Sequence, residues 1–145
     1  MAKKEIIAFD PPTEEEIMLI QPNNVTFGQY NVSEWQENLL TLIGDKIQKH
    51  MTREEELPRD LFNQPYVVIM CDEAGGKNNK NKVLKEAIDM LNKRFSFRWL
   101  HPKMKKEIET TGGSVITNIH NIKGTNQIMV NLNPWAIPFL IYYGV

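Results

Sequence analysis

The chain has 145 residues, of which 41% are hydrophobic and 24% are charged, and its formal net charge is −1. This length suits one domain with a core of its own, and the composition is typical of a soluble globular protein. The longest apolar run, WAIPFLIYY at 135–143, is about half the length of a membrane-spanning helix. We expect no secretory signal peptide, because the start of the sequence turns acidic where an apolar stretch would be required.

The first 30 residues are predicted to form an arm. DPPTEEE at 10–16 combines two prolines with a run of acidic side chains, which makes a poor start for a core. The segment 17–32 supplies apolar residues between turn residues and is expected to contribute either a strand or a short packed segment. We therefore predict an N-terminal arm over 1–30 and a single domain over 31–145.

SEWQENLLTLIGDKIQKH at 33–50 carries the clearest helical pattern. Ser33 and Gln36 have the spacing of a capping box, in which each residue accepts a hydrogen bond from the other's backbone N–H. Apolar residues recur on one face; these are Trp35, Leu39, Leu42, Ile43 and Ile47. Gly44 weakens the helix interior by roughly 1 kcal/mol relative to alanine, and we expect the apolar stripe to offset this cost.

YVVIMC at 66–71 predicts a buried strand, and DEAGGKNNKN at 72–81 predicts a turn region. The AGGK within it does not fit a phosphate-binding loop. That pattern needs a glycine five residues before the Gly-Lys pair and a Ser or Thr after it, and both are missing. Cys71, the one cysteine, ends this strand and is expected to be an inert core thiol, so no disulfide framework exists.

A second helix is predicted from about Lys80 to Arg94. Its apolar face is expected to hold Leu84, Ala87, Ile88 and Leu91, with Val83 at the margin. Its opposite, solvent-facing side is expected to hold Lys82, Lys85, Asp89, Asn92 and Lys93.

The charges of the chain are unevenly distributed. Residues 1–60 hold 12 acidic and 6 basic side chains, whereas residues 77–106 hold 10 basic side chains against Glu86 and Asp89. A local positive field attracts phosphates even on a nearly neutral chain. From charge alone, a solvated helix face and a face that binds a polyanion are equally good interpretations.

FSFRWL at 95–100 alternates as a strand does, with Phe95, Phe97 and Trp99 on one side. HPKMKKEIETTGG at 101–113 is interpreted as a long connection. SVITNIHNI at 114–122 and IMVNL at 128–132 then predict a hairpin around the tight turn KGTNQ. A closing helix follows, with Asn133 as its cap and Pro134 at its first position. Because the chain stops while still apolar, we expect a domain cut from a longer protein.

This order of elements is that of a winged helix, an α+β fold with a helix-turn-helix and a β-hairpin wing. In that architecture the helix before the hairpin enters the major groove of DNA and the wing touches the backbone. His120, Asn121 and Lys123 would lie near the tip of the wing.

Three stretches carry a resemblance to a known family. VSEWQENLLTLIGDKIQKHM, YVVIMCDEAGGKNNKNKVLKEAIDMLNKRFSFRW and SVITNIHNIKGTNQIMVNLNPWAIPFLIYY, together spanning roughly residues 20–143, resemble the N-terminal winged-helix domain of plasmid replication initiator (Rep) proteins of the iteron-binding type. The resemblance implies two tandem winged helices, of which this is the first. It also implies that the second domain recognises most of the repeat sequence, while the first adds DNA contacts and forms the dimer interface.

The partners implied by the resemblance are double-stranded DNA at the repeats of a plasmid origin, a second copy of the chain and host replication proteins, in the bacterial cytoplasm. The residues expected to contact DNA are Lys77, Lys80, Lys82, Lys85, Asn92, Lys93 and Lys123. Two alternatives remain open at this point. One is a dimerisation module without direct DNA contact, and the other is a winged-helix transcription regulator that binds a small effector.

The sequence offers little for catalysis. His50, His101 and His120 are far apart and show no metal-ligand spacing. The glutamates at 14–16 and 54–56 lie in polar runs that are better explained as solvated than as paired catalytic carboxylates. We therefore expect no enzyme activity, metal or cofactor. We expect core positions for the three tryptophans, Trp35, Trp99 and Trp135, because they lie on apolar faces. The less favoured alternative is that they stack on nucleic-acid bases.

Overall fold

The computed structural model describes residues 16–17, 20–28, 30–75, 79–101 and 105–143. Its named helices are α2 (Glu34–Thr52), α3 (Cys71–Gly75), α4 (Lys80–Met90) and α5 (Ala136–Tyr142). Its strands are β1 (Asn23–Thr26), β2 (Tyr66–Met70), β3 (Arg94–Leu100), β4 (Glu107–Ser114), β5 (Ile116–Ile122) and β6 (Gln127–Leu132).

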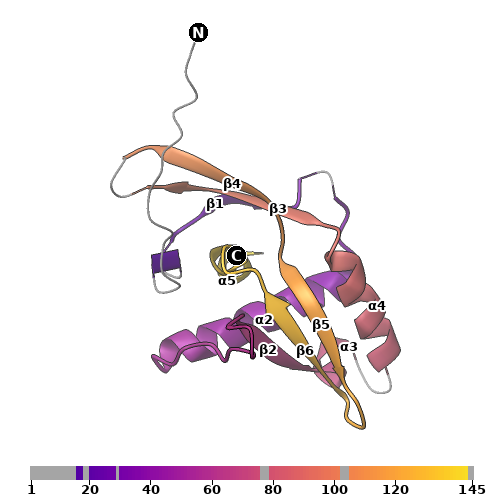
Figure 1. Cartoon of the computed structure of the whole chain (residues 1–145). Helices are drawn as coiled ribbons and strands as arrows, with labels where there is room; N and C mark the ends of the chain where they lie inside the picture. The colour runs from indigo at the N-terminus through magenta and orange to yellow at the C-terminus, as the bar shows by residue number, and fades with distance from the viewer. Residues whose placement is uncertain (1–15, 18–19, 29, 76–78, 102–104, 144–145) are drawn as a thin grey trace.

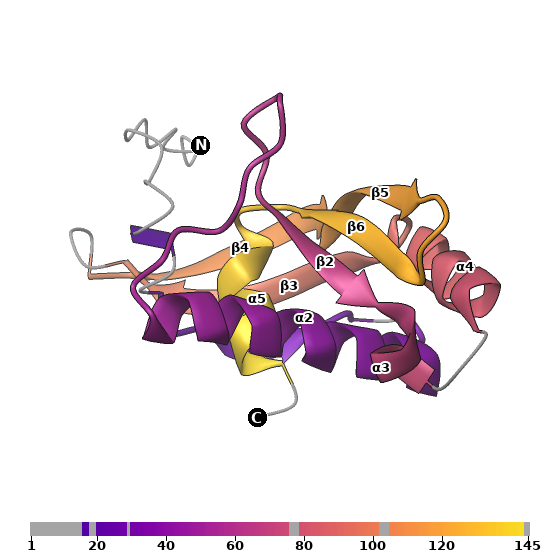
Figure 2. The same cartoon turned by 90° about the horizontal axis from the view of Figure 1, so that it is seen from below.

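The strands form two antiparallel three-stranded sheets, with the orders β1-β3-β4 and β2-β6-β5. Figure 1 shows the first sheet across the top of the molecule and α5 between that sheet and the long helix α2. Seen from below in Figure 2, α2 runs along the whole molecule, and α4 lies at one end of it. The alternation of helices with short strands and the closing β5–β6 hairpin are those of an α+β winged helix, as the sequence predicts.

The N-terminus of α2 confirms the predicted capping box. The Ser33 hydroxyl accepts a hydrogen bond from the Gln36 N–H at 3.2 Å, and the Gln36 side-chain oxygen accepts one from the Ser33 N–H at 3.0 Å. The expected apolar face is also present, since Leu39, Ile43 and Ile47 are fully buried. These two local signals explain why α2 begins where it does and which side faces the core.

Helix α5 packs closely against α2, and Gly44 makes this possible. A Cβ atom at position 44 would lie only 2.6 Å from the carbonyl oxygen of Leu140 in α5. On its other side α5 reaches the first sheet through Phe139, whose ring centroid lies 4.9 Å from that of Phe27 and 5.3 Å from that of Phe95. The glycine that weakens an isolated helix therefore permits the close packing of two helices.

The N-terminal segment contributes both a strand and packed side chains. β1 pairs with β3 at the positions Asn23–Arg98 and Thr26–Ser96. Ile17, Ile20 and Phe27 are buried in the core. The described part of the predicted arm thus packs onto the domain, and residues 1–15 lie outside the described residues.

The segment 101–113, which we predicted to be a connection, contains strand β4, so this prediction is wrong. β4 is paired with β3 from Leu100–Glu107 to Arg94–Ser114. The sequence EIETTGGS has little apolar alternation, because β4 is an edge strand and takes its stability from the hydrogen-bond ladder to β3. The hairpin strand predicted from residue 114 consequently begins at Ile116.

Helix α4 also differs from its prediction. It ends at Met90 instead of near Arg94, because Arg94 already pairs with Ser114 in the sheet. Its buried residues are Val83, Ala87 and Met90, whereas Ile88 is 53% exposed. The apolar face is therefore rotated so that Val83 lies at its centre. Cys71, predicted at the end of a strand, is the first residue of α3.

Two further expectations concern buried side chains. Trp99 is buried and Trp35 and Trp135 are half-buried against the core, which favours the interpretation that these rings stabilise the fold. Cys71 is fully buried, and burial raises the pKa of its thiol. Among the described helices, none is long and apolar enough to cross a bilayer.

We expect Gly44→Ala to lower the free energy of unfolding by about 1–2 kcal/mol. Overpacking against the Leu140 carbonyl costs about 1–3 kcal/mol, and the gain in helix propensity returns at most about 1 kcal/mol. Urea unfolding followed by circular dichroism measures the difference. Asn38→Ala, at an exposed position of the same helix, is the matched control and should not lose stability. A Gly44→Ala protein as stable as this control would contradict the close packing of α2 and α5.

Candidate functional site

Helix α4 and the β5–β6 hairpin lie side by side at one end of the molecule (Figure 1). Lys80, the first residue of α4, joins them. Its ammonium group donates hydrogen bonds to the carbonyl oxygens of Ile122 at 2.9 Å and Thr125 at 2.6 Å, both at the tip of the hairpin. An ammonium group that donates to two carbonyl oxygens fixes the hairpin tip relative to the helix.

The hairpin tip itself is held by Thr125 and Gly124. The Thr125 hydroxyl donates to the Ile122 carbonyl at 2.7 Å and accepts from the Gln127 N–H at 3.2 Å. Gly124 has φ +77°, a conformation that glycine adopts without steric cost. The tight turn expected between residues 123 and 127 is therefore confirmed, and it presents Lys123 to solvent.

A polar network anchors α4 to the start of α2. The Gln36 side chain is 1% exposed, and its amide donates to the Asp89 carboxylate at 2.7 Å and to the Glu86 carbonyl at 3.3 Å. The Ser33 hydroxyl, the same group that caps α2, donates to the Glu86 carboxylate at 2.9 Å. The sequence predicted the cap, but it did not predict that the capping residues also hold a second helix.

Lys93 completes this network. Its ammonium group lies 2.6 Å from the Gln36 side-chain oxygen and 3.1 Å from Asp89, and it also donates to the Asn31 carbonyl. The side chain is only 13% exposed. Lys93 therefore departs from its predicted solvent-facing position, because α4 ends before it and the chain turns it back toward α2.

The carboxylates of this network are held in their ionised form. The hydrogen bond from Lys82 lowers the pKa of Glu86, with a smaller contribution from Ser33. The hydrogen bond from the Gln36 amide lowers the pKa of Asp89, with a second contribution from Lys93. In both cases, hydrogen bonds and positive charge favour the carboxylate.

The remaining basic residues on this surface differ in how they are engaged. Lys82 pairs with Glu86 at 3.0 Å, and its ammonium group lies 5.8 Å from the centre of the Trp35 ring. Lys85 and Lys123 are exposed and form no hydrogen bond or ion pair with the described part of the chain. Asn92 is exposed in the turn after α4, whereas Lys77 lies outside the described residues.

The outward side of β5 adds polar groups that the sequence indicated only in part. Asn118 and His120 are exposed on this strand, with the Asn118 amide nitrogen 3.2 Å from the His120 ring nitrogen. Strict alternation would place Asn118 and His120 on the same face as Ile116 and Ile122, so the sequence pattern did not single out this polar side. The register shift between Ile116 and Asn118 lies in this part of the strand. Among the described residues, no group of three His, Cys, Asp or Glu side chains is placed to hold a metal ion.

The family model described as "Initiator Replication protein, WH1" matches residues 18–144. Among solved structures, the chain is similar to the WH1 domain of MSBI1.176, a replication protein isolated from a multiple sclerosis patient. That match has 14% identity and a TM-score of 0.48, and it covers 77% of this chain and 82% of the other. The search of curated proteins found no match.

The network around Gln36 predicts that acid weakens the anchoring of α4. Because the folded-state pKa of Asp89 is lowered, its contribution to stability is full above the pKa of the unfolded chain and is lost as the pH falls through the folded-state pKa. We expect Asp89→Asn to be less stable at neutral pH and to show a shallower loss of stability than the unchanged protein below about pH 4. Urea midpoints measured across this pH range test the prediction, with Asp45→Asn on α2 as the control. Parallel pH profiles for Asp89→Asn and the unchanged protein would contradict it.

Proposed function

The chain belongs to the WH1 domain family of initiator replication proteins. We propose that it binds double-stranded DNA at a plasmid origin and associates with a second copy of itself. The DNA surface in this proposal is α4 together with the β5–β6 hairpin. The observation that carries it is the clamp from Lys80 to the hairpin tip, which joins a helix and a wing into one rigid unit.

The arrangement of this surface supports contact with a duplex. In winged helices the helix lies in the major groove while the wing contacts the neighbouring backbone, so the two elements must keep a fixed separation. Both connections of α4 supply this rigidity, since Lys80 holds its first turn to the hairpin and the Gln36 network holds its last turns to α2. Little reorganisation is then needed on binding, which favours affinity.

The basic residues would have different roles on DNA. Lys85 and Lys123 have ammonium groups available for phosphates, one on the helix and one on the hairpin. Lys82 is 46% exposed and can exchange its bond to Glu86 for a phosphate oxygen. Lys80 and Lys93 would act mainly by holding the surface in shape and by adding to its positive field.

Lys77 and Asn92 complete the proposed set. Lys77 is included on the sequence pattern alone, because it precedes α4 in the same basic run. Asn92, exposed just after the helix, can donate to a phosphate or a base edge. Contacts to the backbone carry no base identity, so this surface by itself would bind DNA with little sequence preference.

Self-association is included in the proposal because of a separate observation. Leu61 and Phe62 are neighbours in the chain and both are almost completely exposed, and contiguous exposed apolar surface is a feature of protein–protein contact sites. Host replication proteins, which the resemblance also implies, would be further partners of the same domain.

We expect the double variant Lys85→Ala/Lys123→Ala to bind random duplex DNA more weakly. Each lost phosphate contact should also make the slope of log Kobs against log salt less steep by about 1. Fluorescence anisotropy from low to physiological salt measures both effects. Lys46→Ala/Lys49→Ala removes the same charge from the far half of α2 and is the matched control. An unchanged slope for Lys85→Ala/Lys123→Ala would overturn the assignment of the DNA surface to α4 and the hairpin.

A further inference from the structure

His120 is exposed on the outward side of β5, in the hairpin that forms the proposed DNA surface together with α4. Between Ile116 and Leu132 the sequence has two ionisable side chains, His120 and Lys123. A lysine stays charged at neutral pH, whereas histidine is the side chain whose charge ordinarily changes there. His120 is therefore the residue through which a small change in pH can alter the charge of the hairpin.

The amide of Asn118, which lies beside His120 on this side of the strand, has a fixed orientation. Its oxygen accepts a hydrogen bond from the Ile119 N–H at 2.9 Å. Its nitrogen, which can only donate, consequently faces the His120 Nε2 at 3.2 Å. This contact is a hydrogen bond only when Nε2 carries no proton. The geometry is therefore that of a neutral ring with its proton on Nδ1.

Protonation of His120 removes this hydrogen bond. Both ring nitrogens of a charged imidazole carry a hydrogen atom and are donors. The Nε2–H group and the Asn118 amide nitrogen would then be two donors that face each other at the distance of a hydrogen bond. Because two donors repel, the Asn118 amide must turn away from the charged ring toward another acceptor.

An unused acceptor lies directly across the ladder from Asn118. Its partner in the pairing of β5 with β6 is Asn131, which is 2% exposed. The Asn131 nitrogen donates to the Asp60 carboxylate at 3.0 Å, whereas its oxygen has no hydrogen-bond partner among the described residues. Directly opposite residues have Cβ atoms about 4.5–5.5 Å apart, so the Asn118 amide can reach this oxygen. A buried acceptor without a partner is unfavourable, which favours the new hydrogen bond.

The groups that border His120 come from the loop before β2 and from β6. Asp60 in that loop carries a negative charge. Its pKa is lowered, chiefly by the hydrogen bond from the Gln64 N–H, and the positive charge of His120 acts in the same direction. On β6, the residue opposite His120 is the uncharged Met129. A charged His120 thus faces one carboxylate across the sheet, and its exposed ring remains available to an anion in solution.

We propose that His120 makes the DNA contact of the hairpin sensitive to pH. In its neutral form the ring holds the Asn118 amide, and in its charged form it releases that amide to Asn131 and adds a positive charge to the hairpin that carries Lys123. Phosphates bind the charged form more strongly, so the affinity for DNA rises as the pH falls and the ring gains its proton, and this gain is lost as the pH rises. The inference rests on the proposed DNA surface and adds a condition that regulates it.

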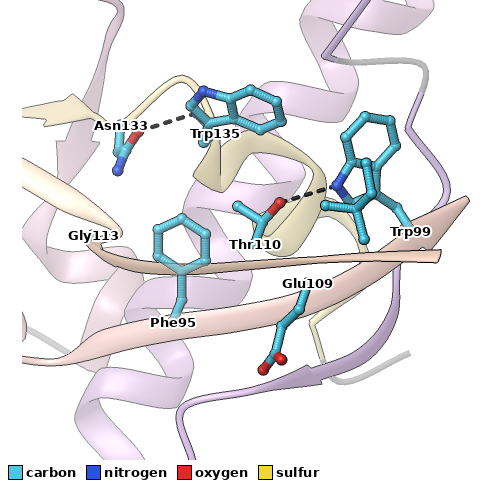
Figure 3. Close-up of a pocket in the computed structure, with 8 residues that line it drawn as sticks. Phe95, Trp99, Glu109, Thr110, Gly113, Asn133 and Trp135 are labelled. Carbon is cyan, nitrogen blue, oxygen red and sulfur yellow. Dashed lines mark hydrogen bonds between the residues drawn. The ribbon is translucent and has the colours of Figure 1, made fainter. Parts of the chain in front are cut away.

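The other two histidines are placed differently. His101 is 8% exposed, and its ring centroid lies 5.2 Å from that of Trp99. The Trp99 N–H in turn donates to the Thr110 hydroxyl at 3.0 Å (Figure 3), so His101 packs against a side chain that is itself held in place. His50 lies in the last turn of α2, with its Nδ1 3.6 Å from the Glu55 carboxylate. His50→Gln therefore removes a histidine away from the hairpin and serves as the matched control.

An NMR titration from about pH 8 to about pH 5.5 tests the switch without DNA. We expect the side-chain amide signals of Asn118 and Asn131 to shift together with the ring signals of His120. In His120→Gln, where residue 120 is neutral throughout, the Asn118 signals should stay constant, whereas in His50→Gln they should still shift. Asn118 signals that do not follow the His120 ring would overturn the inference.

Fluorescence anisotropy with random duplex DNA at the two ends of this pH range tests the consequence. At about 0.15 M salt we expect the unchanged chain to bind about fivefold more tightly at the lower pH, which is the gain from one additional phosphate contact. His120→Gln should lose most of this gain, and His50→Gln should keep it. Equal gains in the two variants would overturn the inference. If the unchanged chain bound DNA at neither pH, the proposed DNA binding itself would be wrong, and the NMR titration would still decide whether the Asn118 amide follows His120.

Discussion

The arrangement of this domain depends on one buried amide, the side chain of Gln36. Its oxygen accepts from the Ser33 N–H and from the Lys93 ammonium group, and its nitrogen donates to the Glu86 carbonyl and the Asp89 carboxylate. Both donors and both acceptor sites of the amide are thereby used. A buried amide that loses one of these partners costs about 1–3 kcal/mol, so α4 cannot slide or rotate on α2 without breaking several bonds at once.

This constraint also decides which charges face outward. The Lys93 ammonium group and the carboxylates of Glu86 and Asp89 are drawn into the network, while Lys80 is committed to the hairpin tip. Part of the positive charge of the segment 77–106 is therefore already engaged in contacts within the domain. Lys85 and Lys123 remain at the surface on the two elements that the network and the clamp hold in place. The contacts that fix α4 and the hairpin relative to each other therefore also determine which basic side chains of this surface stay exposed.

The two proposed contacts of the domain rely on different forces and lie apart. A lysine surface that binds phosphates weakens as salt rises, because counterions compete for the phosphates. The proposed association through the exposed side chains of Leu61 and Phe62 would depend on apolar burial, which salt does not screen and kosmotropic salts strengthen. Each contact is also preorganised, by Gln36 on one side and by the hydrogen bonds of Asp60 on the other. The two proposed contacts would therefore respond independently to changes in either surface.

The sequence by itself determined the features that depend on neighbouring residues. The Ser33–Gln36 cap, the apolar stripe of α2, the alternation of β3 and the hairpin turn at Gly124 follow from local spacing and backbone preferences. Of the site, it predicted the exposed positions of Lys82, Lys85 and Lys123. Only the tertiary structure decided that EIETTGGS forms β4, that Val83 is buried while Ile88 is exposed and that Lys93 is drawn into the Gln36 network. In each of these cases the deciding partner lies on another element, β3 for the strand and the core or α2 for the helix, and no local pattern encodes a hydrogen bond or a packing contact made across the fold.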